Sequence, residues 1–131
     1  MNRLKISQTC PCGGLSYDKC CKQFHLQVTL ANTAEQLMRS RYSAFALKNE
    51  SYLLKTWHPS TRPIPPLFSA IETQKWVELR IKNTSISTQN EAYVEFIAIY
   101  KVDGKAHRLH ENSKFIKEND QWFYLNGTFP N

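Results

Sequence analysis

Several features that define large protein classes are missing from this sequence of 131 residues. It has no glycine-rich phosphate-binding loop, no nucleophile elbow and no metalloprotease motif, which removes the enzyme classes built on them. No apolar run approaches the roughly 20 residues of a membrane-spanning helix. The first nine residues lack the apolar stretch of a signal peptide. Internal repeats and low-complexity tracts are also absent. These absences predict a cytoplasmic protein without a membrane span.

Cysteine is absent from residues 22–131 and is clustered before them. Two close pairs lie within twelve residues, Cys10 with Cys12 and Cys20 with Cys21. Gly13 and Gly14 permit backbone conformations that are closed to other residues, so the second pair can fold back on the first. Four thiolates in a tetrahedron suit zinc, with Zn–S distances of about 2.3 Å. The spacing therefore predicts a zinc site.

Two other uses of four cysteines compete with zinc binding. Two disulfides are disfavoured because nothing in the sequence indicates export, and reducing compartments keep thiols free. A redox-active dithiol usually shows C-x-x-C, whereas this chain has C-x-C and C-C. His25 follows the cysteines and is a further candidate ligand. Because four sulfurs already complete a set, we expect His25 to serve in packing.

The cysteine stretch resembles the SEC-C motif, a small zinc-binding element named after the C-terminus of the translocase ATPase SecA. That motif reads C-P-C-G-S-G-x-x-[YF]-x-x-C-[CH]. It matches Cys10, Pro11, Cys12, Gly13, Tyr17, Cys20 and Cys21. Seven residues separate Cys12 from Cys20, where the motif usually has eight, and the shortening falls at residues 14–16. The resemblance implies zinc as the cofactor and a chaperone, a translocase or the ribosome as the partner.

Length and composition predict one ordinary domain with a small addition at its start. Hydrophobic residues make up 41% and aromatic residues 12% of the chain, which is enough to build a core. We divide the chain into a cysteine motif, residues 1–27, and a main domain, residues 28–131. The formal net charge of +6 permits contact with RNA, ribosomes or acidic proteins without requiring it.

The first part of the main domain has helical signals. Thr33 can cap a helix, with Gln36 reaching back as in a capping box. Apolar residues at three- and four-residue spacing then predict a helix over 34–48. The break at 49–51 can cap a second, short helix over 52–57. One more helical turn is expected over 69–74.

From Trp76 onward the pattern alternates as in strands. We expect strands over 76–82, 91–102, 105–117 and 121–125, with an irregularity at Asn112 in the third. Asp103-Gly104 is a typical two-residue hairpin turn, and Asn119-Asp120 turns the chain again. Helices followed by antiparallel strands predict an α+β domain, in which a curved sheet wraps around helices as a cone with a pocket inside.

The main domain also resembles the YchJ-like family of bacterial proteins. The resemblance rests on residues 33–45, 52–54, 56–63, 94–96, 109–113, Phe115 and 122–124. It implies a nuclear-transport-factor-2-like, cystatin-like α+β fold joined to a SEC-C motif. The family brings no settled activity to carry over to this chain.

Eight residues are candidates for a pocket: Arg41, Tyr42, Trp57, His58, Arg62, Glu95, His110 and Glu111. His110 and Glu111 are neighbours in one strand, so they should point to opposite faces of the sheet. Glu95 on the adjacent strand could meet one of them. A buried Glu95 would need a cation, and Arg41 or Arg39 is the expected partner. We favour a buried structural network of Arg41, Glu95 and His110 over a catalytic role for these residues.

Three functions follow from these features. The favoured one is a zinc-binding, non-catalytic adaptor whose tip, near Leu15, Tyr17 and Lys19, contacts a protein partner. The second is small-molecule binding or catalysis in the cone, with His110, Glu95 and an arginine. The third is weak RNA binding by the basic surface. Zinc loss is expected to unfold the cysteine motif and leave the main domain folded.

Overall fold

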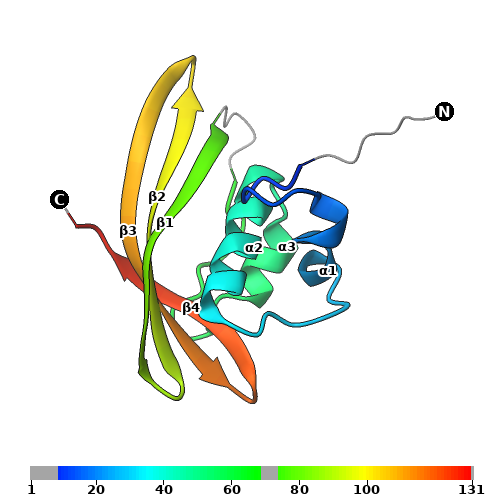
Figure 1. The fold of residues 1–131 in the computed structure, drawn as a ribbon, viewed down its shortest axis with the longest axis vertical. Helices are drawn as coiled ribbons and strands as arrows, with labels where there is room; N and C mark the ends of the chain where they lie inside the picture. Colours follow the sequence, from blue (N-terminus) through cyan, green and yellow to red (C-terminus); the bar gives the residue numbers. More distant parts are fainter. Residues whose placement is uncertain (1–8, 69–73, 131) are drawn as a thin grey trace.

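The computed structural model describes residues 9–68 and 74–130. The helical turn expected over 69–74 falls almost entirely outside these ranges. The described residues form an antiparallel sheet with helices on one side, so the predicted α+β cone is confirmed (Figure 1). Among the described residues, no helix is long and apolar enough to cross a membrane.

The sheet has four strands in the order of the sequence, each antiparallel to the next. The strands are β1 Lys75–Thr88, β2 Glu91–Val102, β3 Lys105–Glu118 and β4 Gln121–Thr128. Asp103 and Gly104 have φ angles of 51° and 81°, and Asn119 and Asp120 have 53° and 62°. Positive φ at both central residues matches the right-handed strand twist, so both predicted turns form tight hairpins.

Three details of the strands differ from the sequence prediction. Strand β1 continues to Thr88, six residues beyond the expected end at residue 82. The pairing of β2 with β3 passes through Asn112 without a break, and the shift lies instead between Lys114 and Phe115 on the β4 side. Strand β4 also continues through Gly127, which pairs with Ser113. A Cβ at Gly127 would collide with the Glu111 carboxylate. Glycine often ends a strand, but Gly127 instead lets the Glu111 carboxylate lie close to the β4 backbone.

Helix α2, Ala34–Ala46, begins where the sequence places it and ends two residues earlier. The Thr33 hydroxyl accepts a hydrogen bond from the Gln36 amide at 3.1 Å, while the Gln36 side chain accepts from the Asn32 amide at 2.7 Å. Helix α3, Glu50–Lys55, is capped by Asn49, whose side chain accepts from the Tyr52 amide. Both predicted helices are therefore confirmed, with caps that satisfy otherwise free backbone amides.

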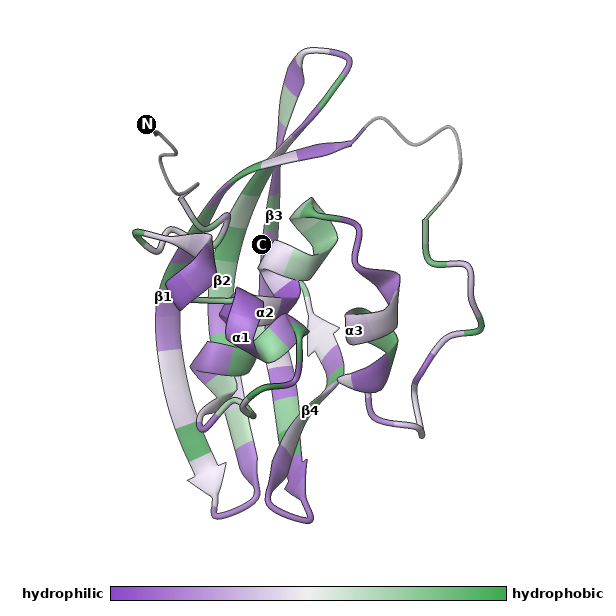
Figure 2. Cartoon of the chain, turned by 90° about the vertical axis from the view of Figure 1, so that its right-hand side faces the viewer, coloured by the Kyte–Doolittle hydropathy of each residue, from purple (hydrophilic) through white to green (hydrophobic). Residues whose placement is uncertain are grey.

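Helix α2 lies against the concave face of the sheet, and α3 packs against α2 (Figures 1 and 2). Alternate residues of β2 are fully buried on that face: Ala92, Val94, Phe96 and Ala98. They pack with Leu37, Met38 and Tyr42 of α2 in the main core. The chain after α3 runs along β4, since the amides of His58 and Tyr124 each donate 2.8 Å hydrogen bonds to backbone carbonyls across this contact.

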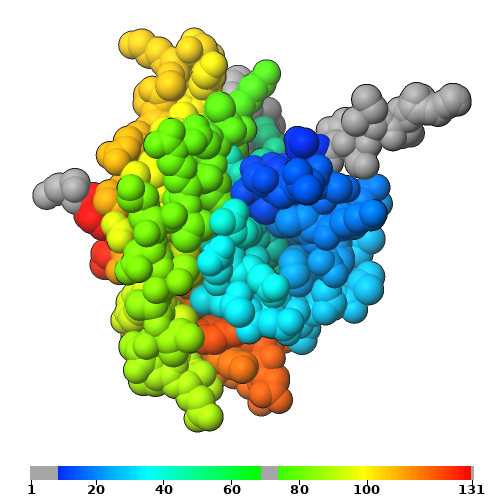
Figure 3. Space-filling model, in the orientation of Figure 1, coloured from blue at the N-terminus to red at the C-terminus, as the bar shows by residue number. Residues whose placement is uncertain are grey.

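The cysteine motif is packed onto the other side of α2. It contains a short 3-10 turn, η1 Tyr17–Lys19, and a one-turn helix, α1 Lys22–His25. Figure 3 shows this segment in direct contact with α2. Phe24 is buried in a cluster with residues of α2 and α3. The described part of the motif, residues 9–27, is therefore packed against the main domain rather than standing apart from it.

Candidate metal centre

The four cysteine sulfurs converge on one point. Their Sγ atoms all lie within 4.8 Å of one another, with Cys12 and Cys20 3.6 Å apart and Cys20 and Cys21 3.9 Å apart. All four are free thiols. Four sulfurs around a zinc ion at about 2.3 Å would be about 3.8 Å apart at the edges of the tetrahedron. The donor set and its spacing therefore fit a tetrahedral metal ion.

The turn between the two cysteine pairs depends on both glycines. The Cys10 amide donates to the Gly14 carbonyl at 3.0 Å, and the Gly13 amide donates to the Cys10 carbonyl at 2.9 Å. Gly13 has φ of +105°, a conformation that side chains disfavour. A Cβ on Gly14 would lie 2.9 Å from the Cys20 Sγ. The loop is thus shorter than in the SEC-C motif but still brings all four sulfurs together.

Helix α2 supplies the surroundings of the sulfurs. Cys10, Cys12 and Cys21 are each 3% exposed or less, whereas Cys20 is partly open to solvent. The Ser43 hydroxyl donates to the Cys21 Sγ at 3.2 Å and lies 3.4 Å from the Cys10 Sγ. Such contacts from outside the ligand set orient metal ligands and offset the charge of thiolates.

Arg39 joins the same face of α2 to the cysteine loop. Its Nη1 donates to the Cys12 carbonyl at 3.0 Å, and its Nε donates to Glu35 at 2.9 Å. Sequence reasoning missed the roles of Arg39 and Ser43. Their spacing of four residues places them on one helix face, which is the signal that could have pointed to a shared contact.

The thiols cannot all ionise at this distance without a cation. Hydrogen bonds from the Cys21 thiol and the Gly14 amide, against the effect of burial, lower the pKa of Cys12 to about 5. Burial and the neighbouring Cys12 raise the pKa of Cys20 to about 12, and the bond to Cys12 raises the pKa of Cys21. Without a metal, one cysteine is thus ionised and accepts hydrogen bonds from neighbouring thiols. A bound dication would favour loss of the remaining thiol protons.

His25 links the cysteine motif to the main domain. Its Nε2 lies 2.8 Å from the Ser40 carbonyl, which can only accept, so Nε2 carries the proton. The Tyr17 hydroxyl then donates to Nδ1 at 2.8 Å. The ring packs 4.7 Å from Tyr52, centre to centre. Burial lowers the pKa of His25, which keeps the ring neutral. The expected packing role of His25 fits this arrangement.

The eight pocket candidates separate into two groups. Arg41, Tyr42, Trp57 and Glu111 line one cavity of about 270 Å³ inside the cone, which also has Trp76 at its wall. The others, His58, Arg62, Glu95 and His110, lie outside this lining.

The expected pair of Arg41 and Glu95 is wrong. Glu95 points to the convex face of the sheet, where His110 Nε2 lies 2.7 Å from its carboxylate. Glu111, the neighbour of His110, faces the helices instead. The reason is strand alternation, because Arg41 on the concave side cannot reach a residue on the far face. Arg39 cannot pair with Glu95 either, because Arg39 faces the cysteine loop and Glu95 lies on the far face of the sheet.

Arg41 is held by α3 and two aromatic rings. Its Nη1 donates to the Leu53 carbonyl at 2.9 Å and to the Thr56 hydroxyl at 2.7 Å. Its guanidinium lies 4.9 Å from the ring centre of Trp57 and 4.7 Å from that of Tyr124. Burial lowers the pKa of Arg41 to about 10, which still leaves it charged at neutral pH.

His58 and Arg62 stabilise the connection after α3. His58 Nδ1 lies 2.7 Å from the Ser60 hydroxyl, and His58 Nε2 lies 3.0 Å from the Glu118 carboxylate. The guanidinium of Arg62 donates twice to the Trp57 carbonyl, at 3.1 and 2.9 Å. These contacts hold residues 57–62 in place as a connector between α3 and the rest of the chain.

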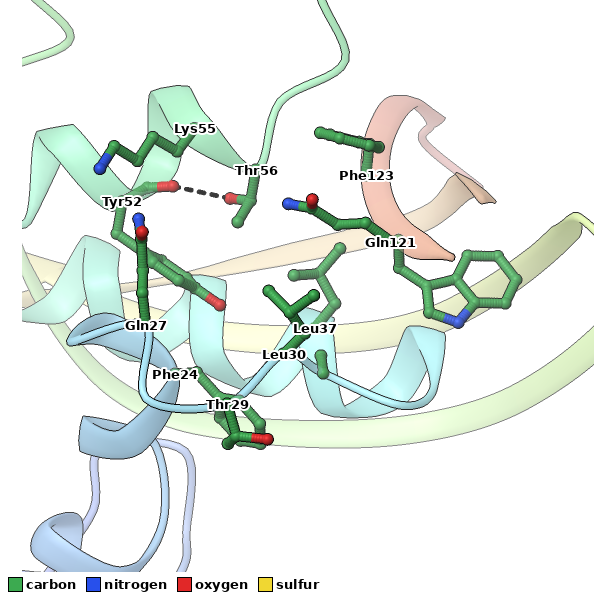
Figure 4. Close-up of a pocket in the computed structure, with 12 residues that line it drawn as sticks. Phe24, Gln27, Thr29, Leu30, Leu37, Tyr52, Lys55, Thr56, Gln121 and Phe123 are labelled. Carbon is green, nitrogen blue, oxygen red and sulfur yellow. Dashed lines mark hydrogen bonds between the residues drawn. The ribbon is translucent and has the colours of Figure 1, made fainter. Parts of the chain in front are cut away.

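A second hollow of about 310 Å³ lies where the end of the cysteine motif meets α3 and β4 (Figure 4). Phe24, Leu37 and Tyr52 contribute apolar surface to it. Gln27, from the segment that follows α1, and Gln121, from β4, add amide groups. This groove spans the junction of the two parts of the chain, so its shape depends on how the cysteine motif is docked.

Comparison with known proteins agrees with this architecture. Residues 33–127 match the family model described as the YchJ middle NTF2-like domain. A UPF0225 protein of Methylibium petroleiphilum is 46% identical over 123 residues, which covers 90% of this chain and 86% of that protein. A UPF0225 protein of Bordetella pertussis is also 46% identical, with 90% of each chain covered.

Two solved structures share this fold, and both are described as SEC-C motif containing proteins. The solution structure of a SEC-C motif containing protein from Rhodopseudomonas palustris is 33% identical, with a TM-score of 0.82, and the match covers 95% of this chain and all of the other. The crystal structure of a SEC-C motif containing protein from Psychrobacter arcticus is 31% identical, with a TM-score of 0.79 and coverage of 95% and 84%. The chain therefore belongs to the YchJ-like family, with a nuclear-transport-factor-2-like domain behind a four-cysteine SEC-C cluster.

Proposed function

We propose that this chain is a zinc-binding, non-catalytic adaptor that acts in the cytoplasm. The observation that carries the proposal is the closed set of four cysteine sulfurs within 4.8 Å of one another. Zinc sites with four protein ligands are structural, because catalysis needs an open position for water or substrate. The free thiols that such a site requires are kept reduced in the cytoplasm.

The contact surface for the partner is the tip of the cysteine loop. Leu15 is 95% exposed and stands between the two cysteine pairs, while Lys19 is also exposed. A bound zinc would hold this apolar side chain in a fixed place above α2, which reduces the entropy lost on binding. By resemblance to the SEC-C motif of SecA, the partner is a protein of the chaperone, translocase or ribosomal machinery.

Metal analysis tests the first half of this function. Protein purified without chelator should contain one zinc per chain, and the double variant Cys20→Ser, Cys21→Ser should contain none. Ser87→Ala, a change at an exposed hydroxyl of β1, is the matched control and should keep its zinc. Wild-type protein that folds fully while free of metal would contradict a structural zinc site.

Site-specific crosslinking tests the second half. A photo-crosslinking residue at position 15 should capture a defined protein in cells, whereas the same residue at Ile86, which is 79% exposed on β1, should not. The captured protein should then bind purified wild-type chain and lose affinity for Leu15→Asp. Crosslinks to RNA with steep salt dependence would instead support RNA binding and overturn the protein-adaptor function.

A further inference from the structure

The cavity inside the cone is built differently from an ordinary core. It occupies about 270 Å³ between α2, Trp57 and the concave face of the sheet. Trp57 and Tyr124 pack edge to face at 5.2 Å on one wall, and Tyr42 and Trp76 do so at 5.7 Å on another. Protein cores rarely leave space of this size unfilled. Aromatic walls with a few polar groups are typical of sites for small molecules.

A cation and a carboxylate both face this space. Arg41 lines it, and its Nη1 is occupied by acceptors from α3. Both hydrogen bonds that Arg41 makes within residues 9–68 and 74–130 come from Nη1, and neither Nε nor Nη2 donates to an acceptor there. Five N–H groups of a guanidinium normally find partners when buried. The Nε and Nη2 groups of Arg41 can therefore donate to an acceptor on a ligand.

Glu111 is fixed in position by three neighbours. Its Oε2 accepts from the Ser113 hydroxyl at 2.7 Å and from the Tyr124 hydroxyl at 3.0 Å. The carboxylate also lies so close to Gly127 that only glycine fits there. Its Oε1 has no donor among the described residues. A carboxylate that borders the cavity, is held this firmly and has one oxygen without a donor can accept a hydrogen bond from a ligand.

Arg41 and Glu111 do not neutralise each other by direct contact. Within the described part of the chain no ion pair of 4.0 Å or less joins them. Tyr124 contacts both, because its hydroxyl donates to Glu111 and its ring lies under the Arg41 guanidinium. Trp57, in the same wall, has a buried indole N–H with no acceptor in the described ranges. The wall therefore offers unused donors beside an unused acceptor.

We infer that this cavity binds a small, planar, uncharged ring that presents a hydrogen-bond acceptor beside a donor, as a cyclic amide does. The aromatic walls select a flat ring. The acceptor of the ligand faces Arg41, and its donor faces Glu111. One positive and one negative side chain balance each other, so a ligand of either charge leaves one of them uncompensated. The volume lies just below the roughly 300–1,000 Å³ of sites for larger ligands, which limits the occupant to a single ring system.

An NMR titration of the full chain with 2-pyridone, a cyclic amide, tests the inference. The indole N–H of Trp57 reports on the cavity, and that of Trp122 is an internal control because it donates to the Asn32 carbonyl elsewhere. A titration to about 10 mM covers the millimolar Kd values of weak fragments. The Trp57 signal should shift and saturate, while the Trp122 signal should stay in place.

Three further compounds of similar size test the chemical class. Benzoate carries a negative charge, benzylamine a positive charge, and fluorobenzene lacks the amide edge. All three should bind more weakly than 2-pyridone. If any of them binds as tightly or more tightly, or if none of the four compounds moves the Trp57 signal, the inference is overturned.

Two matched variants test the named acceptor. Glu111→Gln should weaken 2-pyridone binding about tenfold, as expected for the loss of a hydrogen bond to a charged group. Glu95→Gln, on the opposite face of the same sheet, should leave the affinity unchanged. If Glu111→Gln fails to fold, Trp57→Phe is the replacement variant. It keeps an aromatic ring and removes the indole N–H, and it should weaken 2-pyridone binding about fivefold, as measured by the shift of the Trp76 signal. Unchanged affinity in the folded variant would contradict the inference.

Discussion

Removal of the metal should destabilise the whole chain rather than the cysteine motif alone. Without zinc, residues 9–27 have little apolar surface of their own and should lose their fold. Phe24 would then leave its buried cluster with Tyr52 and Leu53. Three of the four cysteines also belong to the main core, alongside residues of α2 and β2. Loss of the metal should therefore also disturb the packing of α2 on the sheet.

The expected loss can be worked from these contacts. Removing a buried phenylalanine costs about 3–5 kcal/mol. The hydrogen bonds of Arg39 to the Cys12 carbonyl and of His25 to the Ser40 carbonyl contribute about 1 kcal/mol each. The conformational entropy regained by the released segment offsets part of this sum. We take about 4 kcal/mol as the net loss of unfolding free energy, which corresponds to a fall in Tm of about 15 °C.

Thermal unfolding followed by circular dichroism measures this change, with and without a strong zinc chelator. Added zinc should restore the original Tm. The double variant Cys20→Ser, Cys21→Ser should start at the low Tm and should not respond to chelator. An unchanged Tm, with amide signals moving only in residues 9–27, would refute the reasoning and support the expectation from the sequence that the main domain stays folded without zinc.

Three other changes have clear expected outcomes. Arg41→Met leaves the buried Leu53 carbonyl without its donor and should cost about 1–3 kcal/mol in urea unfolding, whereas Glu95→Gln should cost less than about 1 kcal/mol. Equal effects would contradict the assignment of Arg41 to the core and Glu95 to the outer face. Gly127→Ala should cost about 1–3 kcal/mol through its collision with Glu111, measured in the same way, and a neutral effect would mean that the carboxylate is not fixed. Burial lowers the pKa of His25 in the folded state. Its contribution to stability is therefore present above the unfolded-state pKa near 6.5 and is lost as the pH falls through the folded-state pKa. His25→Gln should flatten the pH dependence of Tm between about pH 7 and 5.

The helices, hairpin turns and overall fold could be predicted because their signals are local. The cap at Thr33, the two-residue turn at Asp103 and the change from helical to alternating pattern at Trp76 each lie within a few residues of sequence. The cysteine cluster was equally accessible, since its spacing alone brings the sulfurs together. Local signals of this kind agree with the fold that the whole chain adopts.

The partners of buried charges were harder to predict because they depend on the packing of distant segments. Charge alone predicts a pair of Arg41 with Glu95, but the register of β2 with β3 places Glu111 on the inner face. The docking of the cysteine motif was missed for a related reason. Ser43 and Arg39 read as ordinary helix residues, and nothing near them in the sequence shows that a loop 22 to 27 residues earlier packs on them.

X-ray absorption spectroscopy at the zinc edge, on protein purified without added metal, tests the central claim most directly. Four sulfur neighbours at about 2.3 Å, with no nitrogen or oxygen neighbour, are the expected result for a closed structural site. A site with an exchangeable water or a histidine ligand, or protein that folds stably with no zinc, would contradict the account of the cysteine cluster as the structural element on which the adaptor surface depends.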